Sequence, residues 1–169
     1  MVIEKKFINK MLIDFQTIQQ CTQDVHPATI MRIMTVETKK NPYTLGFRIV
    51  KNKQDYYIAN QPKTLAQAKY TARWLYDRGY AFDAGIAQIN STNFKRFGVT
   101  PENVFDTCTN IKVAGKILSE FYQLAFRNIK DEQLALQAAI SAYNSGKFNS
   151  ALGRQYVAKV MQVKIESFK

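Results

Sequence analysis

The sequence predicts a single α+β domain that is mainly helical and carries one small β-hairpin. Of its 169 residues, 46% are hydrophobic, which is enough for one well-buried core and too little for two. Apolar residues recur at spacings of three and four through most of the chain, as they do in amphipathic helices. Only residues 47–59 pair two β-prone runs around a polar connection, a pattern typical of a hairpin.

The first twenty residues predict an amphipathic helix. Lysines stand early in this stretch, as in an export signal, but Asn9, Lys10 and Asp14 interrupt the apolar run that such a signal needs. We expect residues 1–20 to form a helical extension and residues 21–169 to form the domain. Nothing in the sequence approaches the roughly 18 uninterrupted apolar residues of a membrane span, so no transmembrane segment is predicted.

The remaining elements follow from capping and spacing signals. A helix is expected to begin at Pro27, a residue favoured in the first helical turn, and to stop before Asn41, because a residue that precedes proline avoids the helical conformation. A second helix runs from Leu65 to a stop at Gly79, and residues 82–106 form a turn-rich connection. Trp74 stands among apolar residues of this second helix and is expected in the core rather than at a sugar-binding surface. Three helical runs complete the chain: Ile111–Arg127, Asp131–Asn144 and Arg154–Phe168.

Glu37 is the unexpected residue of the first of these helices. Ile30, Ile33 and Met34 share one apolar face, and the next position on that face is Glu37. A carboxyl among apolar neighbours loses hydration, which raises its pKa and keeps it protonated near neutral pH. That property suits a general acid. The alternative is that the helix is phased differently, or that Glu37 pairs with a nearby lysine.

A second polar stretch, "FDAGIAQINS" at residues 82–91, combines amides with a glycine. Gly85 permits a close approach of the backbone to another group, and Gln88 and Asn90 have amides that can bind sugar hydroxyls and N-acetyl groups. The alternative is a buried strand edge in which Asp83 is an ordinary turn residue.

A third stretch, "SAYNSG" at residues 141–146, stands at a predicted helix end. It brings Tyr143 and Asn144 together. The alternative is an ordinary C-cap, in which Gly146 stops the helix and Tyr143 packs.

The formal charge of +11 favours a polyanionic partner, which could be nucleic acid, an acidic membrane surface or a cell wall. The basic residues are scattered along the chain, and it contains no known nucleic-acid-binding motif. We therefore predict no specific nucleic-acid site.

Cys21 and Cys108 are the two cysteines. They lack CxxC spacing and the chain holds a single histidine, so no metal site is predicted. In an oxidising compartment the two cysteines are expected to pair, whereas in a reducing one both are buried thiols. The even count in an export-compatible chain favours the disulfide.

Taken in this order, the three polar stretches resemble the VirB1-type lytic transglycosylases, lysozyme-fold enzymes that accompany type IV secretion and conjugation machinery. The family pattern E-[ST]-x-x-N-P is similar to "ETKKNP" at Glu37–Pro42, and D-x-G-[IL]-x-Q-I-N is similar to "DAGIAQIN" at Asp83–Asn90. A-Y-N-[SA]-G is matched at Ala142–Gly146. The similarity extends from about Cys21 to about Val160 and includes "QYVAKV" near its end.

This resemblance implies a lysozyme-like (goose-type or SLT-like) domain, a peptidoglycan substrate, and Glu37 as the catalytic acid. It implies no metal or organic cofactor. It also implies components of a secretion or conjugation machine as partners and a periplasmic or wall-associated location, although no clear signal peptide is found. The residues expected to bind substrate are Thr38, Asp83, Gln88, Asn90, Tyr143 and Asn144.

The implied reaction uses one glutamate twice. Glu37 protonates the oxygen between N-acetylmuramic acid and N-acetylglucosamine, then removes the proton of the muramic C6 hydroxyl, giving a 1,6-anhydro product. Tyr143 is expected to hold the carboxyl. One alternative is hydrolysis with Asp83 as a second carboxylate, because "DAGIAQINS" also resembles the strand of animal-type lysozymes. Another is a non-catalytic wall-binding module.

Overall fold

The computed structural model describes residues 15–165 and confirms the mainly helical α+β class. The helices in this part of the chain are α1 (Phe15–Cys21), α2 (Pro27–Thr38), α3 (Leu65–Asp77), α4 (Phe94–Phe97), α5 (Thr107–Ile129), α6 (Glu132–Ser145) and α7 (Ala151–Gln162). The strands are β1 (Leu45–Gly46), β2 (Arg48–Lys51), β3 (Gln54–Tyr57), β4 (Asp83–Ala84) and β5 (Ile89–Asn90), and a 3₁₀ turn, η1 (Ser91–Asn93), follows β5.

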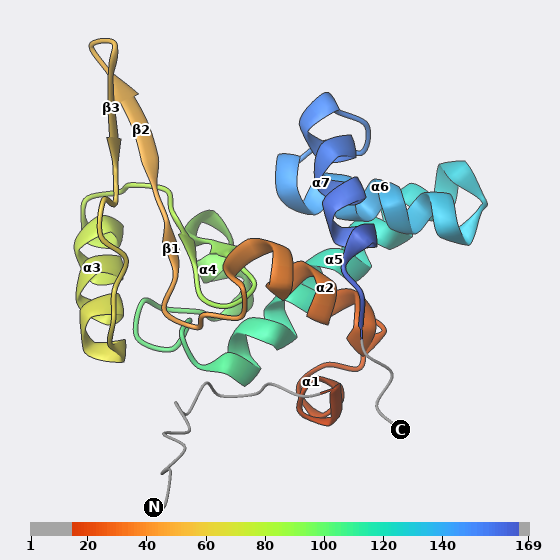
Figure 1. The fold of residues 1–169 in the computed structure, drawn as a ribbon, viewed down its shortest axis with the longest axis horizontal. Coiled ribbons are helices and arrows are strands. Elements are labelled where there is room, and N and C mark those ends of the chain that lie inside the picture. Colours follow the sequence, from red (N-terminus) through yellow and green to blue (C-terminus); the bar gives the residue numbers. More distant parts are fainter. Residues whose placement is uncertain (1–14, 166–169) are drawn as a thin grey trace, which may run out of the picture.

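The elements form two lobes (Figure 1). The smaller lobe holds all five strands with α3 and α4, while α6 and α7 lie on the opposite side and α2 and α5 run between. One antiparallel sheet has the strand order β1-β4-β5, and the other is the β2-β3 hairpin. The core passes through both lobes, and its largest fully buried side chains are Ile18, Ile30, Ile33, Met34, Leu45, Phe82, Ile86, Ile89, Phe94, Ile111, Leu118 and Ile140.

Side-chain caps account for the main differences from the expected helix boundaries. Helix α5 begins at Thr107, earlier than expected, because the Asp106 carboxylate accepts a hydrogen bond from the Thr109 backbone N–H at 2.8 Å. Helix α7 begins at Ala151 rather than Arg154, since the Ser150 hydroxyl caps it. The cap keeps the pKa of the Asp106 carboxyl below its usual value through its bonds to Thr109.

The expected hairpin is present, displaced by one or two residues. Its turn residues Asn52 and Lys53 have φ values of 53° and 62°, as the twist of a tight antiparallel hairpin requires. The hairpin projects from the smaller lobe (Figure 1). All four residues of β3 are exposed.

Helix α1 covers the end of the expected N-terminal extension, and residues 1–14 lie outside the described residues. Ile18 of α1 is fully buried, and α1 packs on α2 and α5. Gly115 of α5 permits this approach, because a Cβ at that position would lie 2.3 Å from the Thr22 hydroxyl oxygen. Between residues 15 and 165, no helix is long and apolar enough to cross a membrane.

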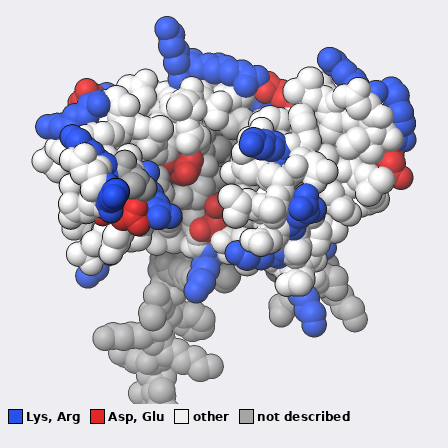
Figure 2. All heavy atoms as spheres, turned by 90° about the horizontal axis from the view of Figure 1, so that it is seen from above, with Lys and Arg blue, Asp and Glu red and all other residues white. Residues whose placement is uncertain are grey.

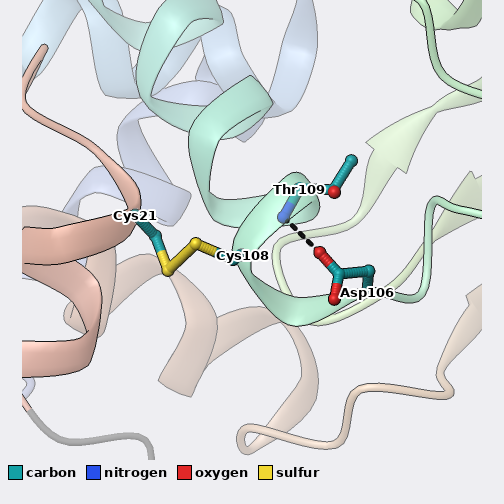
Figure 3. The surroundings of a disulfide bond; sticks show 4 residues. All are labelled: Cys21, Asp106, Cys108 and Thr109. Atoms are coloured by element: carbon teal, nitrogen blue, oxygen red, sulfur yellow. Dashed lines mark hydrogen bonds between the residues drawn. A yellow bond between two sulfur atoms is a disulfide. The ribbon is translucent and has the colours of Figure 1, made fainter.

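Cys21 and Cys108 form a disulfide that joins the end of α1 to the first turn of α5 (Figure 3). It closes a loop with a sequence separation of 87 residues. Of the two states that the sequence left open, the structure has the oxidised one.

Trp74 of α3 does not lie in the core, where its apolar helical neighbours led us to expect it. It is 42% exposed, it stacks on Tyr80, and the Arg78 guanidinium carbon lies 4.1 Å from its ring centroid. The expected position of Trp74 is wrong because the buried face of α3 is occupied by Leu75, one position further along the helix.

The disulfide predicts a large loss of stability on its removal. The double substitution Cys21→Ala, Cys108→Ala is expected to lower the free energy of unfolding by about 4 kcal/mol, because a long loop in the unfolded chain is no longer closed. Urea denaturation with and without reductant measures this. Reductant should destabilise the unsubstituted protein and leave the double variant unaffected; equal stabilities would contradict the prediction.

Candidate active site

Glu37 stands in the last turn of α2, on the face that the sequence pattern assigned to it. Ile30, Ile33 and Met34 are fully buried, and Glu37 continues their stripe as a half-buried side chain. Burial raises the pKa of its carboxyl, a hydrogen bond from Tyr156 lowers the pKa in part, and the charge of Asp83 raises it further. The net result is a raised pKa, which is the condition for a carboxyl to donate a proton near neutral pH.

Tyr156 of α7 is the direct partner of this carboxyl. Its hydroxyl donates a hydrogen bond to Oε1 of Glu37 at 2.5 Å, across 119 positions of sequence. The Tyr156 ring is buried, and burial followed by the charge of Glu37 raises the pKa of its phenol far above the usual value. Tyr156 therefore remains a neutral donor that fixes the orientation of Glu37.

The expectation that Tyr143 holds the carboxyl is wrong. The Tyr143 hydroxyl donates instead to the Ala87 carbonyl at 2.7 Å. Sequence reasoning missed Tyr156, although it stands four positions before the buried Val160 on one face of α7 and within the "QYVAKV" stretch. That periodicity shows an inward-facing tyrosine but not what it meets.

Thr38, expected to bind substrate, is 8% exposed and lies beneath the site. Its hydroxyl bonds to the Ile86 carbonyl at 2.9 Å and to the Met34 carbonyl at 3.2 Å. It thus links the end of α2 to residues 83–90, which we call the amide loop. Because the single hydrogen of this hydroxyl is shared by two backbone carbonyls, Thr38 has no donor left for a ligand.

Asn110 of α5 supports the amide loop from the other side. Its Nδ2 donates to the Ala84 carbonyl at 3.0 Å and its Oδ1 accepts from the Ala87 backbone N–H at 2.9 Å. Gly85 makes this possible: its φ is +82°, and a Cβ there would lie 2.2 Å from Asn110 Nδ2. The close approach expected at Gly85 is confirmed, while its partner Asn110 was not foreseen.

Asp83 and Asn90 form a pair across β4 and β5. They are register partners, and Asn90 Nδ2 donates to Asp83 Oδ1 at 2.9 Å. Burial raises the pKa of Asp83, and the bond from Asn90 lowers it in part. Because Asp83 also raises the pKa of Glu37, the two carboxyls interact electrostatically within one site.

Gln88 adopts a backbone conformation that is rare for a residue with a side chain, with φ at 54°. Its Nε2 donates to the carbonyls of Thr44 at 3.0 Å and Gly85 at 2.9 Å. Both donor hydrogens of this amide are therefore used, one by Thr44 outside the amide loop and one by Gly85 within it. Backbone strain of this kind concentrates at functional sites.

A cavity of about 460 Å³ lies beside these groups. Five of the residues expected to bind substrate line it: Asp83, Gln88, Asn90, Tyr143 and Asn144. Glu37 and Thr38 are not in its lining. Figure 2 shows a hollow between the two lobes, with acidic side chains in its middle and Lys and Arg side chains around it.

No group of three or more His, Cys, Asp or Glu side chains in residues 15–165 is arranged to bind a metal ion. What the arrangement offers is proton chemistry at Glu37 beside a cavity lined with amides. Such a cavity suits a ligand rich in hydroxyl and amide groups.

Residues 15–165 match the family described as Transglycosylase SLT domain. The "Type IV secretion system protein virB1" of Brucella abortus is 37% identical over 149 residues, covering 85% of this chain and 60% of that protein. "Protein virB1" of Agrobacterium fabrum is 34% identical over 142 residues, covering 84% and 55%. The chain thus spans at most 60% of the length of these curated relatives. No solved structure gives a significant match.

The Tyr156 hydrogen bond predicts a shift in the pKa of Glu37. In Tyr156→Phe the bond that stabilises the ionised carboxylate is lost, so the pKa of Glu37 should rise. Carbon-detected NMR titration of the carboxyl measures it. Tyr143→Phe is the matched control, because its hydroxyl bonds to a carbonyl, and it should shift the pKa less. A fall in Tyr156→Phe, or equal shifts in both, would contradict the assignment.

The contact at Gly85 predicts a stability difference between two glycines that share a positive φ. Gly85→Ala should lower the free energy of unfolding by about 2 kcal/mol more than Gly98→Ala, since it adds displaced buried hydrogen bonds to the common backbone strain. A Cβ at Gly98, where φ is +64°, meets nothing within 4 Å. Urea denaturation of both variants tests this, and equal losses would argue against the role of Asn110.

Proposed function

Because the chain belongs to the transglycosylase SLT family, we propose that it is a peptidoglycan lytic transglycosylase that cleaves the β-1,4 bond between N-acetylmuramic acid and N-acetylglucosamine. The observation that carries the proposal is the half-buried Glu37, whose pKa is raised and whose orientation Tyr156 fixes. Glycosidic oxygen is a poor leaving group, so cleavage needs a positioned acid that is still protonated at working pH.

In the first step Glu37 gives its proton to the glycosidic oxygen, and positive charge develops at the anomeric carbon of the muramic sugar. Glu37 is then ionised. The Tyr156 hydroxyl donates to the resulting carboxylate more strongly than to the neutral acid, because charge strengthens the hydrogen bond. This limits the cost of leaving a charge on a partly buried group.

In the second step the Glu37 carboxylate takes the proton of the C6 hydroxyl of the same sugar. That oxygen bonds to the anomeric carbon, which gives the 1,6-anhydro ring and restores the acid without water. Gln88, Asn90, Tyr143 and Asn144 would bind the sugars, since all four line the cavity. Thr38 would act from beneath by holding the amide loop.

The biological setting follows from the names of the relatives. A relative is named "Type IV secretion system protein virB1". We propose that this enzyme acts in the periplasm and opens a local gap in the wall for a secretion or conjugation machine. Residues 21–169 would form the catalytic domain and residues 1–20 a helical extension. The charge of +11 would favour its association with an anionic wall.

Hydrolysis is the second candidate, and the electrostatic interaction of Asp83 with Glu37 favours it. A second carboxylate can assist attack by water. Burial raises the pKa of Asp83, which makes its ionised form less favourable and so weakens this candidate. A binding module without catalysis would need neither Glu37 nor Asp83 as a carboxyl with a raised pKa.

Digestion of purified peptidoglycan with the unsubstituted protein and with Glu37→Gln tests the proposal. The substitution keeps the shape and removes the proton, so lysis should fall about 100-fold or more, while Glu102→Gln, in an exposed ion pair with Arg73, should leave it unchanged. Mass spectrometry should find anhydromuropeptides. Undiminished lysis by Glu37→Gln would overturn the catalytic role, and products with reducing ends alone would favour hydrolysis.

A further inference from the structure

We propose that one end of the cavity recognises the peptide stem of the wall, with the Arg96 guanidinium binding a free carboxylate of the peptide attached to the glycan. This inference rests on the proposed function and deepens it, because it names peptide-bearing glycan as the preferred substrate. The cavity lining includes a cation and an anion that the proton chemistry at Glu37 does not use: Arg96 and Glu120.

Arg96 and Glu120 come from different helices. Arg96 stands in α4, Glu120 stands in α5, and the Nη2 of Arg96 donates to Oε2 of Glu120. The two side chains are 57% and 43% exposed, so the fold does not depend on burying them. An exposed pair of this kind contributes little to stability, which leaves its place in the cavity wall without a structural reason.

The Arg96 guanidinium is held in place yet has donors to spare. Its carbon lies 4.8 Å from the ring centroid of Phe97, and the bond to Glu120 is its one hydrogen bond within residues 15–165. A guanidinium has five N–H donors in a planar fork, so several remain for a second carboxylate. An arginine that is already oriented loses less entropy when it binds.

The rest of this end of the cavity fits a short peptide. Ile117, Phe121 and Leu124 of α5 give it an apolar floor. A volume of about 460 Å³ lies in the range that holds ligands much larger than one sugar ring. In peptidoglycan the muramic lactyl carboxyl forms an amide bond to a peptide with small apolar side chains and free carboxylates, so the anions that could reach Arg96 belong to the peptide.

Position links the two parts of the ligand. Asn90, which precedes η1, and Asn93, which ends it, line the cavity together with Arg96. Tyr143 and Asn144 line it from α6. A muramic sugar held by these groups would therefore have its lactyl substituent within the same cavity as Arg96. Catalytic preference for peptide-bearing strands would follow from this one contact.

The test compares glycan strands that carry peptides with the same strands after carbodiimide coupling to ammonia has converted the free peptide carboxylates to amides. For each protein, kcat/KM is measured on both substrates, and the ratio of the two values reports peptide recognition. Loss of one charge-assisted contact should lower the ratio about tenfold in Arg96→Gln. Arg73→Gln is the matched control, because Arg73 forms a similarly exposed ion pair with Glu102 away from the cavity, and its ratio should not change.

Glu120→Gln distinguishes recognition of the peptide carboxylate by Arg96 from a purely structural role of the ion pair in linking α4 to α5. It breaks the same ion pair but keeps the Arg96 cation, so recognition predicts an equal or higher ratio, whereas a link predicts the same fall as in Arg96→Gln. A fall in Glu120→Gln, or an unchanged ratio in Arg96→Gln, would overturn this inference alone. If the unsubstituted protein cleaved neither substrate, the proposed function would fail, and this inference with it.

Discussion

The removal of a carboxyl from water at the end of α2 constrains much of this molecule. A half-buried Glu37 needs a hydrogen-bond donor that cannot itself ionise, and Tyr156 meets that need from α7. The donor must arrive from more than a hundred residues away. The packing of α6 against α5 and of α7 against α6 and α2 places Tyr156 beside Glu37. The arrangement of these helices therefore determines the geometry of the hydrogen bond between them.

The amide loop is held in place by side chains from three helices. Three helices, α2, α5 and α6, each contribute one side chain that bonds to its backbone: Thr38 to Ile86, Asn110 to Ala84 and Ala87, and Tyr143 to Ala87. The loop has little regular secondary structure of its own, yet these side chains provide hydrogen-bond partners for its buried backbone groups. Such external support permits the positive φ of Gln88, which would otherwise relax.

Local patterns predicted what local physics decides. The helix of Glu37, its buried face and its orientation followed from spacing and from the proline at Pro27, and the glycine at Gly85 correctly indicated a close approach. What failed depends on contacts distant in sequence. The partners of Tyr156 and Asn110 come from distant parts of the chain, so helical spacing cannot identify them. Trp74 is exposed because no other element within residues 15–165 covers its side of α3, which spacing within the helix does not show either.

The link between Cys21 and Cys108 also has a mechanical consequence. Tension applied to the chain ahead of Cys21 would unwind α1 only as far as that residue, because from there the force passes through a covalent bond into α5. Residues 22–107, which include Glu37 and the amide loop, would carry no tension along the chain until the disulfide was cut. The disulfide therefore keeps this part of the chain in place under load for as long as its surroundings stay oxidising.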